Sequence, residues 1–217
     1  VDSQTDLLCA GDSDGAFSVS ANGGTGDLSF TLNGNSSPDG NFADLSAGDY
    51  TVEVTDANDC SSSIDVSITE PEALTLDNTA QTNVGCNGDS DGAVSLSATG
   101  GTAGYQYELD GQSNTDGEFD GLSAGSYTAT VTDANDCSTT LQIDIDEPTE
   151  LSLSTSMQAD VNCNGDTDGM VSLSANGGSG NYEYTLGNDT NTTGDFDGLS
   201  AGDYTATVTD ENDCQST

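Results

Sequence analysis

The strongest constraint on this sequence is a repeat of fixed length. The motif Gly-Asp-Ser-Asp-Gly at 11–15 returns at 88–92 and, with Thr in place of Ser, at 165–169. Two series of cysteines follow the same constant spacing, namely Cys9, Cys86 and Cys163, and Cys60, Cys137 and Cys214. No insertion interrupts this spacing. Self-similarity at one fixed period predicts a tandem array of a single structural unit.

Within each unit the apolar residues alternate with Ser, Thr and Asp, and no helical stripe appears. Alternation of this kind predicts short strands. The inward-facing residues expected in the first unit are Phe17, Val19, Ala21, Leu28, Phe30, Leu32, Phe42, Leu45, Tyr50, Val52, Val54, Ile64, Val66 and Ile68. Short strands separated by turns indicate an all-β protein made of immunoglobulin-like antiparallel β-sandwich domains. We expect these domains to form an elongated array.

Proline marks the expected domain boundaries. Glu70-Pro71 and Glu147-Pro148 should end the closing strand of a unit, because proline cannot continue a hydrogen-bonded ladder. The sequence therefore divides into the domains 1–71, 72–148 and 149–217. On this division the first domain lacks the start of its opening strand and the third lacks its closing strand. We expect the chain to be a segment of a longer array.

Charge restricts both the partners and the chemistry. The 217 residues include 39 Asp and Glu but no Lys, Arg or His, so the formal net charge is −39. A chain without basic side chains has no histidine base, Schiff-base lysine or phosphate-binding lysine, and we expect no enzymatic activity. Nucleic acid and anionic membrane surfaces are repelled by a field of this sign. No apolar run is long enough for membrane insertion. Cations, neutral sugars and proteins remain as partners.

The cysteines indicate an extracellular protein with oxidised thiols. We expect all six to form disulfides, and pairing within each unit is the leading interpretation. A bridge that closes such a loop of 51 residues would remove about 4 kcal/mol of unfolded-state entropy. These pairs are Cys9 with Cys60, Cys86 with Cys137, and Cys163 with Cys214. The alternative joins neighbouring units, for example Cys9 with Cys137, because the first and last hairpin turns of a seven-stranded sandwich lie at opposite poles.

Acidic turns beside the cysteines are candidate calcium sites. Asn87 to Gly92 matches the opening half of an EF-hand-type loop, in which alternate oxygens face one Ca²⁺ ion. Internal disulfides would bring this turn and the acidic cluster beside the second cysteine together. The candidate ligands are Asp12, Asp14, Asp56, Asp59, Asp89, Asp91, Asp133, Asp136, Asp166, Asp168, Asp210 and Asp213. The alternative is that these residues are ordinary solvated turn formers.

The aromatic residues are better explained as core than as a binding platform. Tyr50, Tyr127 and Tyr204 each follow Ala-Gly at the start of a strand. This position predicts a tyrosine corner, in which the hydroxyl group bonds nearby backbone. There is no tryptophan to stack on a sugar. A lectin-like site would need the loops that differ among the copies, at 35–41, 112–118 and 188–195.

The motifs taken together resemble the SprB-type repeat. In one order, each unit carries Cys-x-Gly-x-x-Asp-Gly, Gly-Gly-Thr/Ser, a Tyr-x-Tyr strand, Leu-Ser-Ala-Gly-x-Tyr-Thr and Val-Thr-Asp-x-Asn-x-Cys. Two departures stand out. Leu28 and Phe30 replace the tyrosines in the first copy, and Asp59, Asp136 and Asp213 occupy a position where the family often has glycine. The resemblance implies very long surface adhesins of gliding Bacteroidota, exported by type IX secretion to the cell surface.

We therefore expect a structural stalk or filament segment of a secreted, repetitive adhesin used in attachment or gliding motility. Its partners would be neighbouring repeats of the same chain, glycans or proteins of a target surface, and other copies of itself. The alternative is a calcium-assisted glycan- or protein-binding module that acts through its variable loops. The strict spacing of the repeat favours the stalk.

Overall fold

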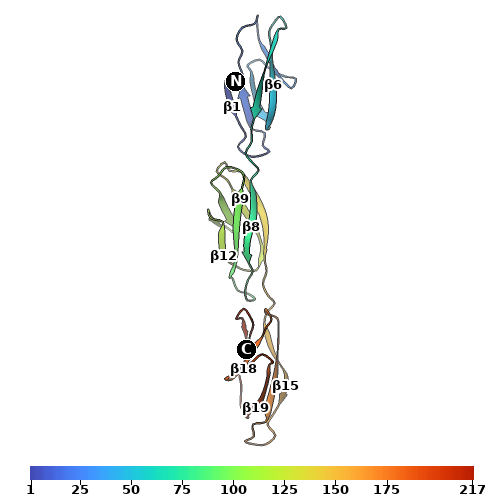
Figure 1. Cartoon of the computed structure of the whole chain (residues 1–217), viewed down its shortest axis with the longest axis vertical. Helices are drawn as coiled ribbons and strands as arrows, with labels where there is room; N and C mark the ends of the chain where they lie inside the picture. Colours follow the sequence, from blue (N-terminus) through green and yellow to red (C-terminus); the bar gives the residue numbers. More distant parts are fainter. The chain divides into compact units, whose positions relative to one another are not determined.

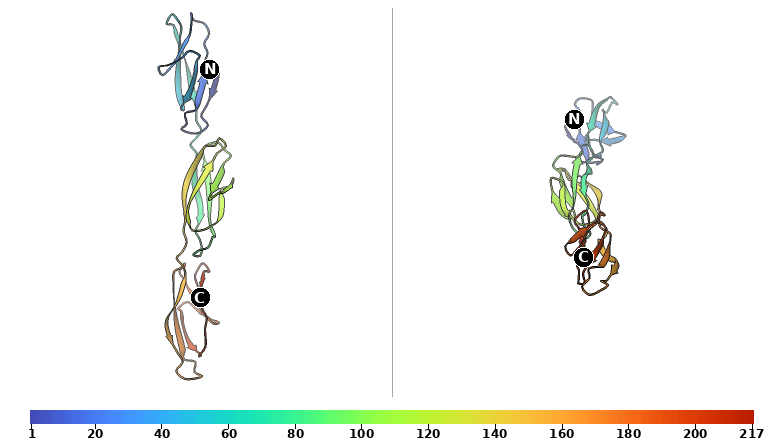
Figure 2. Two further views of the ribbon diagram at one scale, coloured as in Figure 1. Left: turned by 180° about the vertical axis from the view of Figure 1, so that it is seen from behind. Right: turned by 60° about the horizontal axis from the view of Figure 1, so that its bottom comes forward.

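The chain folds entirely into β-strands and loops. The computed structural model describes every residue from Val1 to Thr217, and Figures 1 and 2 show strands along the whole sequence. The strands form six antiparallel sheets, and each repeat has one three-stranded and one four-stranded sheet. The predicted all-β class with immunoglobulin-like sandwiches is confirmed. No helix capable of crossing a membrane, by length and apolar character, is present.

The first repeat sets the strand order that the other two follow. Its three-stranded sheet has the order β1-β2-β5 and its four-stranded sheet the order β4-β3-β6-β7. The bounds are β1 (Ser3–Thr5), β2 (Gly15–Ser18), β3 (Ser29–Leu32), β4 (Asn35–Ser37), β5 (Asn41–Leu45), β6 (Gly48–Thr55) and β7 (Ser61–Ile68).

The same order recurs in the next two repeats. The middle repeat has the sheets β12-β9-β8 and β11-β10-β13-β14, and the third has β15-β16-β19 and β18-β17-β20-β21. The middle strands are β8 (Thr75–Thr82), β9 (Gly92–Thr99), β10 (Gln106–Leu109), β11 (Gln112–Asn114), β12 (Glu118–Leu122), β13 (Gly125–Thr132) and β14 (Ser138–Ile145). The third repeat contains β15 (Ser152–Ala159), β16 (Gly169–Asn176), β17 (Glu183–Leu186), β18 (Asp189–Asn191), β19 (Asp195–Leu199), β20 (Ala206–Thr209) and β21 (Gln215–Ser216).

Some strands differ in length among the repeats. The opening strand has three residues in β1 and eight in β8 and β15, whereas β21 has two residues where β7 and β14 have eight. Pro71 lies between β7 and β8, and Pro148 lies between β14 and β15, so both prolines are outside any strand. Domain boundaries at 71 and 148 stay a prediction.

The core of the first repeat combines side chains from both of its sheets. Phe17 of β2 packs in one cluster with Phe30 and Leu32 of β3, and all three are buried. Because side chains of a strand alternate between its faces, the buried residues of β3 are two apart. Burial of such a side chain contributes about 1.5–3 kcal/mol. One expected core residue is wrong: Ile64, toward the start of β7, is 42% exposed, whereas Val66 and Ile68 farther along the same strand are buried.

Packing groups the chain into two compact units. The first unit contains the whole first repeat and the second contains the whole third repeat, and each includes part of the middle repeat. Their residues are Val1–Asp77, Leu96–Gly117 and Thr128–Leu141 in the first, and Asn78–Ser95, Glu118–Tyr127 and Gln142–Thr217 in the second. Each contact between repeats described below lies within one unit.

A short hairpin occupies part of each segment that the sequence predicts as a variable loop. In the first repeat β3 pairs with β4, and Leu32 is opposite Asn35. The two turn residues, Asn33 and Gly34, have φ angles of 50° and 84°. Positive φ at both positions is typical of the type I′ turn, for which Asn-Gly is the preferred sequence. The loops at 35–41, 112–118 and 188–195 therefore each contain an edge strand, β4, β11 or β18.

The predicted tyrosine corner is present in all three repeats. The hydroxyl groups of Tyr50 and Tyr127 each donate a hydrogen bond of 2.8 Å to a backbone carbonyl, that of Ser46 and Ser123 respectively. Tyr204 makes the equivalent bond to Ser200 at 3.0 Å. Each bond ties the segment after Ala-Gly to the turn that precedes it.

Removal of these hydroxyl groups should lower stability without changing the fold. We expect the variant with Tyr50→Phe, Tyr127→Phe and Tyr204→Phe to lose about 1 kcal/mol per repeat, the net value of one hydrogen bond. Its melting temperature should fall by several degrees while its far-ultraviolet circular dichroism stays the same. An unchanged melting temperature would show that the bonds are replaced by water at no cost.

Candidate functional site at the repeat junctions

The candidate site is the place where consecutive repeats meet. Two disulfides join Cys9 to Cys137 and Cys86 to Cys214, each with a Cα–Cα distance of 5.6 Å and a sequence separation of 128 residues. The first cysteine of one repeat is thus bonded to the second cysteine of the next. Cys60 and Cys163 are free and exposed. The leading prediction of three internal bridges is wrong, and the alternative between neighbours is correct for four of the six cysteines.

The physical reason is the length of the closing strand. Leu7 donates to the carbonyl of Thr69 at 3.0 Å, so the Cys9 turn lies at the far end of β7. Cys60 directly precedes the other end of this strand, which has eight residues. At about 3.3 Å per residue the strand spans roughly 25 Å, whereas a disulfide needs Cα atoms about 4.4–6.8 Å apart. Cys9 and Cys60 therefore lie at opposite poles of their repeat.

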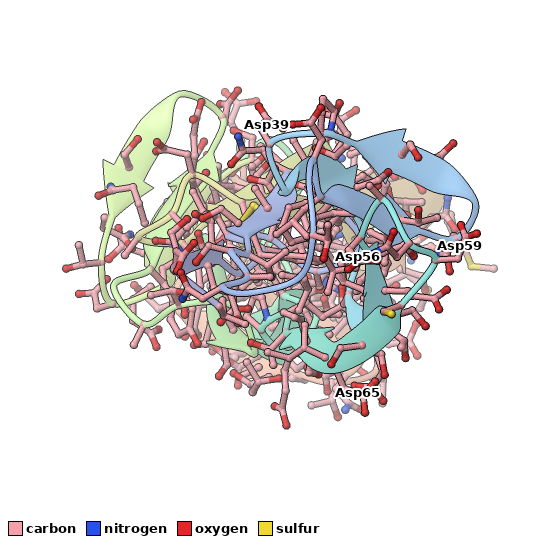
Figure 3. All side chains as sticks on the ribbon, turned by 90° about the horizontal axis from the view of Figure 1, so that it is seen from above. Asp39, Asp56, Asp59 and Asp65 are labelled. Atoms are coloured by element: carbon pink, nitrogen blue, oxygen red, sulfur yellow. A yellow bond between two sulfur atoms is a disulfide. The ribbon has the colours of Figure 1, made fainter.

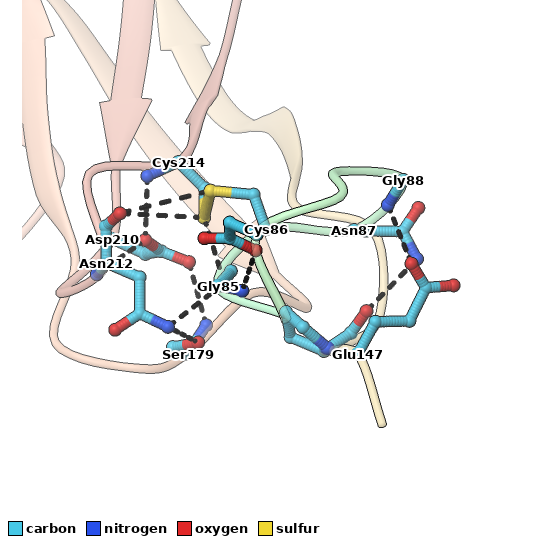
Figure 4. The surroundings of a disulfide bond; sticks show 11 residues. Gly85, Cys86, Asn87, Gly88, Glu147, Ser179, Asp210, Asn212 and Cys214 are labelled. Carbon is cyan, nitrogen blue, oxygen red and sulfur yellow. Dashed lines mark hydrogen bonds between the residues drawn. A yellow bond between two sulfur atoms is a disulfide. The ribbon is translucent and has the colours of Figure 1, made fainter. Parts of the chain in front are cut away.

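An asparagine side chain reinforces each junction. Asn135 donates from its amide nitrogen to the carbonyl of Leu8 at 3.2 Å and to the Thr102 hydroxyl at 2.9 Å. In the second junction, drawn in Figure 4, Asn212 donates to the carbonyl of Gly85 at 3.0 Å and to the Ser179 hydroxyl at 2.8 Å. Both junctions thus use the same residue type at the same position of the repeat, in addition to the disulfide.

One carboxylate shapes the turn that carries the second cysteine. Asp133 is buried and accepts hydrogen bonds from the backbone N–H groups of Thr102, Asn135 and Cys137 at 2.7–3.0 Å. The approach of Thr102 requires glycine at position 101, where φ is +57° and a Cβ atom would lie 2.5 Å from Asp133 Oδ2. The geometry of this turn places Asn135 and Cys137 toward the preceding repeat.

Asp56 and Asp210 repeat this arrangement. Asp56 accepts from the backbone N–H groups of Thr25, Asn58 and Cys60, and Asp210 accepts from those of Ser179, Asn212 and Cys214. The turn is therefore the same in the first repeat, where the cysteine is free, as in the two repeats where it is bonded.

The linker runs beside the disulfide. Glu70 accepts a hydrogen bond from the backbone N–H of Gly11 at 2.6 Å, and Glu72 accepts one through its carbonyl from Gly101 at 2.7 Å. In the second junction Glu147 accepts from the N–H of Gly88 at 2.7 Å, as Figure 4 shows. Two covalent connections, the chain and the disulfide, therefore join each pair of consecutive repeats.

The predicted calcium ligands do not form a shared cluster. Internal disulfides were the condition for bringing Asp12 and Asp14 next to Asp56 and Asp59, and this condition is not met because Cys9 and Cys60 lie at opposite poles. Figure 3 looks onto the end of the first repeat that carries the turn with Asp56 and Asp59. No group of three or more Cys, Asp or Glu side chains is arranged to hold a metal ion. Calcium binding stays a prediction.

Several of the predicted ligands instead bond the backbone of their own loop. Besides Asp56, Asp133 and Asp210, Asp91 accepts from the N–H of Gly85 at 2.9 Å and Asp168 from that of Asn162 at 3.0 Å. Sequence reasoning found these carboxylates but missed their role. For Asp56, Asp133 and Asp210 the signal was available, because an Asp side chain in a turn commonly bonds the backbone N–H two residues later.

The departure of Asp59, Asp136 and Asp213 from the glycine of other SprB repeats has a backbone explanation. These three residues have φ angles of 61°, 65° and 63°. Glycine adopts this left-handed region without strain, and Asp and Asn are among the few other residues that enter it readily. The substitution therefore keeps the turn and adds a negative charge beside the second cysteine.

A family model supports the interpretation of the repeat. The family model described as the SprB repeat matches residues 1–37, 78–114 and 155–191. No curated protein matches the sequence. The chain is 12% identical to the three N-terminal domains of the bacteriophage RB49 Highly Immunogenic Outer Capsid protein, with a TM-score of 0.42, and the match covers 97% of this chain and 82% of that one.

Two further similar structures are longer than this chain. Domains 1–6 of the surface layer protein SbsC are 15% identical, with a TM-score of 0.35, and the match covers 83% of this chain and 33% of that one. Immunoglobulin domains 1–5 of Sidekick-1 are 13% identical, with a TM-score of 0.31 and coverages of 87% and 50%. The chain therefore spans a third of the SbsC structure and half of the Sidekick-1 structure.

The fold and the junctions define a class of protein, namely repetitive proteins of the cell exterior built from immunoglobulin-like sandwiches and tied by disulfides. The three family matches start at the same spacing as the cysteines of each series, and together they cover just over half of the chain. This chain belongs to the SprB repeat family.

The carboxylate of the turn gives a testable pH dependence. Backbone hydrogen bonds, above all that of Thr102, hold the pKa of Asp133 below its ordinary value of 3.8. Since the folded-state pKa is lowered, the stabilisation is present above pH 4 and is lost as the pH falls through the folded-state pKa. The melting temperature of Asp133→Asn should therefore lie below that of the native chain at pH 7, and the gap should narrow as the pH falls through the lowered folded-state pKa of Asp133.

Asp136→Asn is the matched control, since it removes the same charge from the same turn and asparagine tolerates a positive φ. We expect it to show no such pH-dependent gap. Calorimetry of the three proteins between pH 2 and pH 7 makes the comparison. If the melting temperatures of Asp133→Asn and Asp136→Asn changed with pH in the same way, a specific role of the Asp133 hydrogen bonds would be contradicted.

Proposed function

We propose that this chain is a load-bearing stalk segment of a secreted surface adhesin. The observation that carries the proposal is that the same disulfide junction occurs twice, with the same separation of 128 residues and the same supporting asparagine. Family membership supports export by the type IX route and a role in attachment or gliding motility. In this role the chain catalyses no reaction and binds neither nucleic acid nor membrane.

A doubly connected junction suits a segment that transmits tension. A single flexible linker lets neighbouring domains rotate, whereas a second covalent connection beside it restricts bending and limits extension. The loop-closure entropy removed by a bridge of this length is about 5 kcal/mol, so the bridge also opposes unfolding of the segments it encloses. The proposal therefore assigns the disulfides a mechanical as well as a stabilising role.

The two disulfides also provide two parallel covalent paths. One path runs from Val1 to Cys9, along the chain to Cys86, and through the second disulfide to Cys214. The other crosses the first disulfide from Cys9 to Cys137 and then follows the chain to Cys214. Each path between Val1 and Thr217 has 88 residue steps, compared with 216 in a chain without disulfides. Tension is thereby shared after unfolding.

Single-molecule stretching between the chain ends tests this role. The oxidised chain should reach a contour length of about 300 Å and the reduced chain about 730 Å, at roughly 3.4 Å per residue. Because either disulfide alone leaves a path of 88 residue steps, the variant with Cys9→Ser and Cys137→Ser should still stop at the shorter length. Full extension of that variant under oxidising conditions would contradict the parallel paths.

A second candidate role is recognition of a surface glycan or protein through the variable hairpins. The observation that favours it is that β4, β11 and β18 are edge strands of the four-stranded sheets, with different sequences on one backbone design. An edge strand presents unpaired backbone groups and is open to a partner. In this view the hairpins select the target and the remaining framework is the stalk.

The proposal also includes calcium binding by the acidic turns. In the glycine-rich turns, Asp91 and Asp168 bond the backbone of their own loop, which leaves the carboxylates of Asp12, Asp14, Asp89 and Asp166 available to a cation. With no basic side chain in the sequence, a hard cation is the natural counter-charge.

Calcium should therefore raise the melting temperature more than sodium does at matched ionic strength. The effect should be smaller in Asp89→Asn, and it should be retained in Asp110→Asn, a control that removes one charge from a hairpin turn with a positive φ of 49°. Calorimetry with 1 mM calcium chloride, and again after chelation, measures the difference. Equal melting curves in calcium and in sodium would show that these residues are ordinary solvated turn formers.

A further inference from the structure

The two free cysteines are the unmatched halves of the junction that the chain already makes twice. Cys60 belongs to the same series as Cys137 and Cys214, and Cys163 belongs to the series of Cys9 and Cys86. Cys214 is only 8% exposed in its junction, whereas Cys60 and Cys163 are exposed. The difference in exposure follows from whether a neighbouring repeat covers the cysteine.

The Cys60 turn already has the conformation that the bonded turns have. Asp56 accepts the same three backbone hydrogen bonds as Asp133, and Asp59 has a φ angle of 61° compared with 65° at Asp136. Asn58 occupies the position of Asn135. The turn is therefore preorganised, with its asparagine and its thiol at the positions that bind the preceding repeat in the rest of the chain.

The Cys163 loop is prepared in the same way. Its backbone is held by Asp168, which accepts from the N–H of Asn162 at 3.0 Å, as Asp91 does from Gly85 at 2.9 Å. The carbonyl of Gly85 is the acceptor for the asparagine of the second junction. The carbonyl of Asn162, next to Cys163, stands at the equivalent position in the third repeat.

Each free cysteine lies at the pole of its repeat that faces away from the existing junction. In the first repeat, Cys9 and Cys60 are at opposite ends of β7. In the third, β15 pairs with β16 from Ser152 opposite Asn176 to Ala159 opposite Met170. The Cys214 turn adjoins the first of these ends, where Asp210 binds Ser179, and Cys163 follows the second.

We propose that the Cys163 pole is a docking site for the Cys60 pole of another SprB repeat, closed by a disulfide between these two cysteines. The occupant is a second copy of this chain placed in the register of the array. Recognition uses the Asn58 amide and the Asn162 carbonyl, and the covalent bond follows from proximity. This inference goes beyond the load-bearing role, because a stalk could transmit tension without such matched ends.

Formation of the bond is a two-electron oxidation, for which oxidised glutathione is a suitable disulfide reagent. The thiolate of Cys163 attacks one sulfur of the reagent and releases one glutathione thiolate. The thiolate of Cys60 then attacks the Cys163 sulfur of the mixed disulfide and releases the second. One reagent disulfide becomes two glutathione thiols, and the two protein thiols become one disulfide.

A tandem of two complete chains tests the proposal. The segment 141–154 is inserted between Thr217 of the first copy and Val1 of the second, which restores the spacing of the repeat across the join. Cys163 of the first copy and Cys60 of the second are then 128 residues apart, the separation of both existing bridges. The tandem is equilibrated with oxidised and reduced glutathione, alkylated and digested with an acid-directed protease.

In the expected product, Cys60 of the first copy and Cys163 of the second are alkylated. A disulfide-linked peptide joins Cys163 of the first copy to Cys60 of the second. The four disulfides already present in the two copies report that both have folded. The control with Cys60→Ser in the second copy should leave its partner thiol alkylated. Four alkylated cysteines in the tandem, or Cys163 bonded elsewhere, would overturn the proposal. The stretching experiment on the single chain is independent of this result.

Discussion

The junctions of this protein depend on one hydrogen-bonded carboxylate in each repeat. Asp56, Asp133 and Asp210 each accept three backbone N–H groups from two separate segments. This arrangement fixes the turn that carries an asparagine and the second cysteine. From this turn the asparagine reaches a carbonyl of the preceding repeat in both junctions.

Backbone amides compensate these carboxylates in a chain without basic side chains. The 39 acidic groups have no lysine or arginine with which to form an ion pair. Backbone N–H groups are the strongest donors that remain, and charge-assisted bonds to them are stronger than neutral ones. The same N–H donors serve the linker, where Glu70 and Glu147 bind Gly11 and Gly88. Negative charge is thus placed where the backbone offers compensation.

Much of the fold could be predicted because its signals are local. The alternation around Phe30 and Leu32 and the tyrosine that follows Ala-Gly both depend on residues within one strand or turn, and the structure confirms them. The hairpin of β3 and β4 was missed, although Asn33-Gly34 between two extended segments is a strong local signal. The prediction of a buried Ile64 was wrong for a different reason: the alternation continues through Ile64, Val66 and Ile68, but only the later part of β7 is covered by the core.

The sequence by itself determined the repeat, the strands and the residues of the acidic turns, because each of these follows from periodicity or from neighbours along the chain. The tertiary structure alone decided which cysteines pair. A constant spacing of the two cysteine series is compatible with bridges inside a repeat or between repeats. The choice depends on which poles face one another, and that is set by the length of β7 and by the turn at Asp133. These are distances in space, which no local pattern encodes.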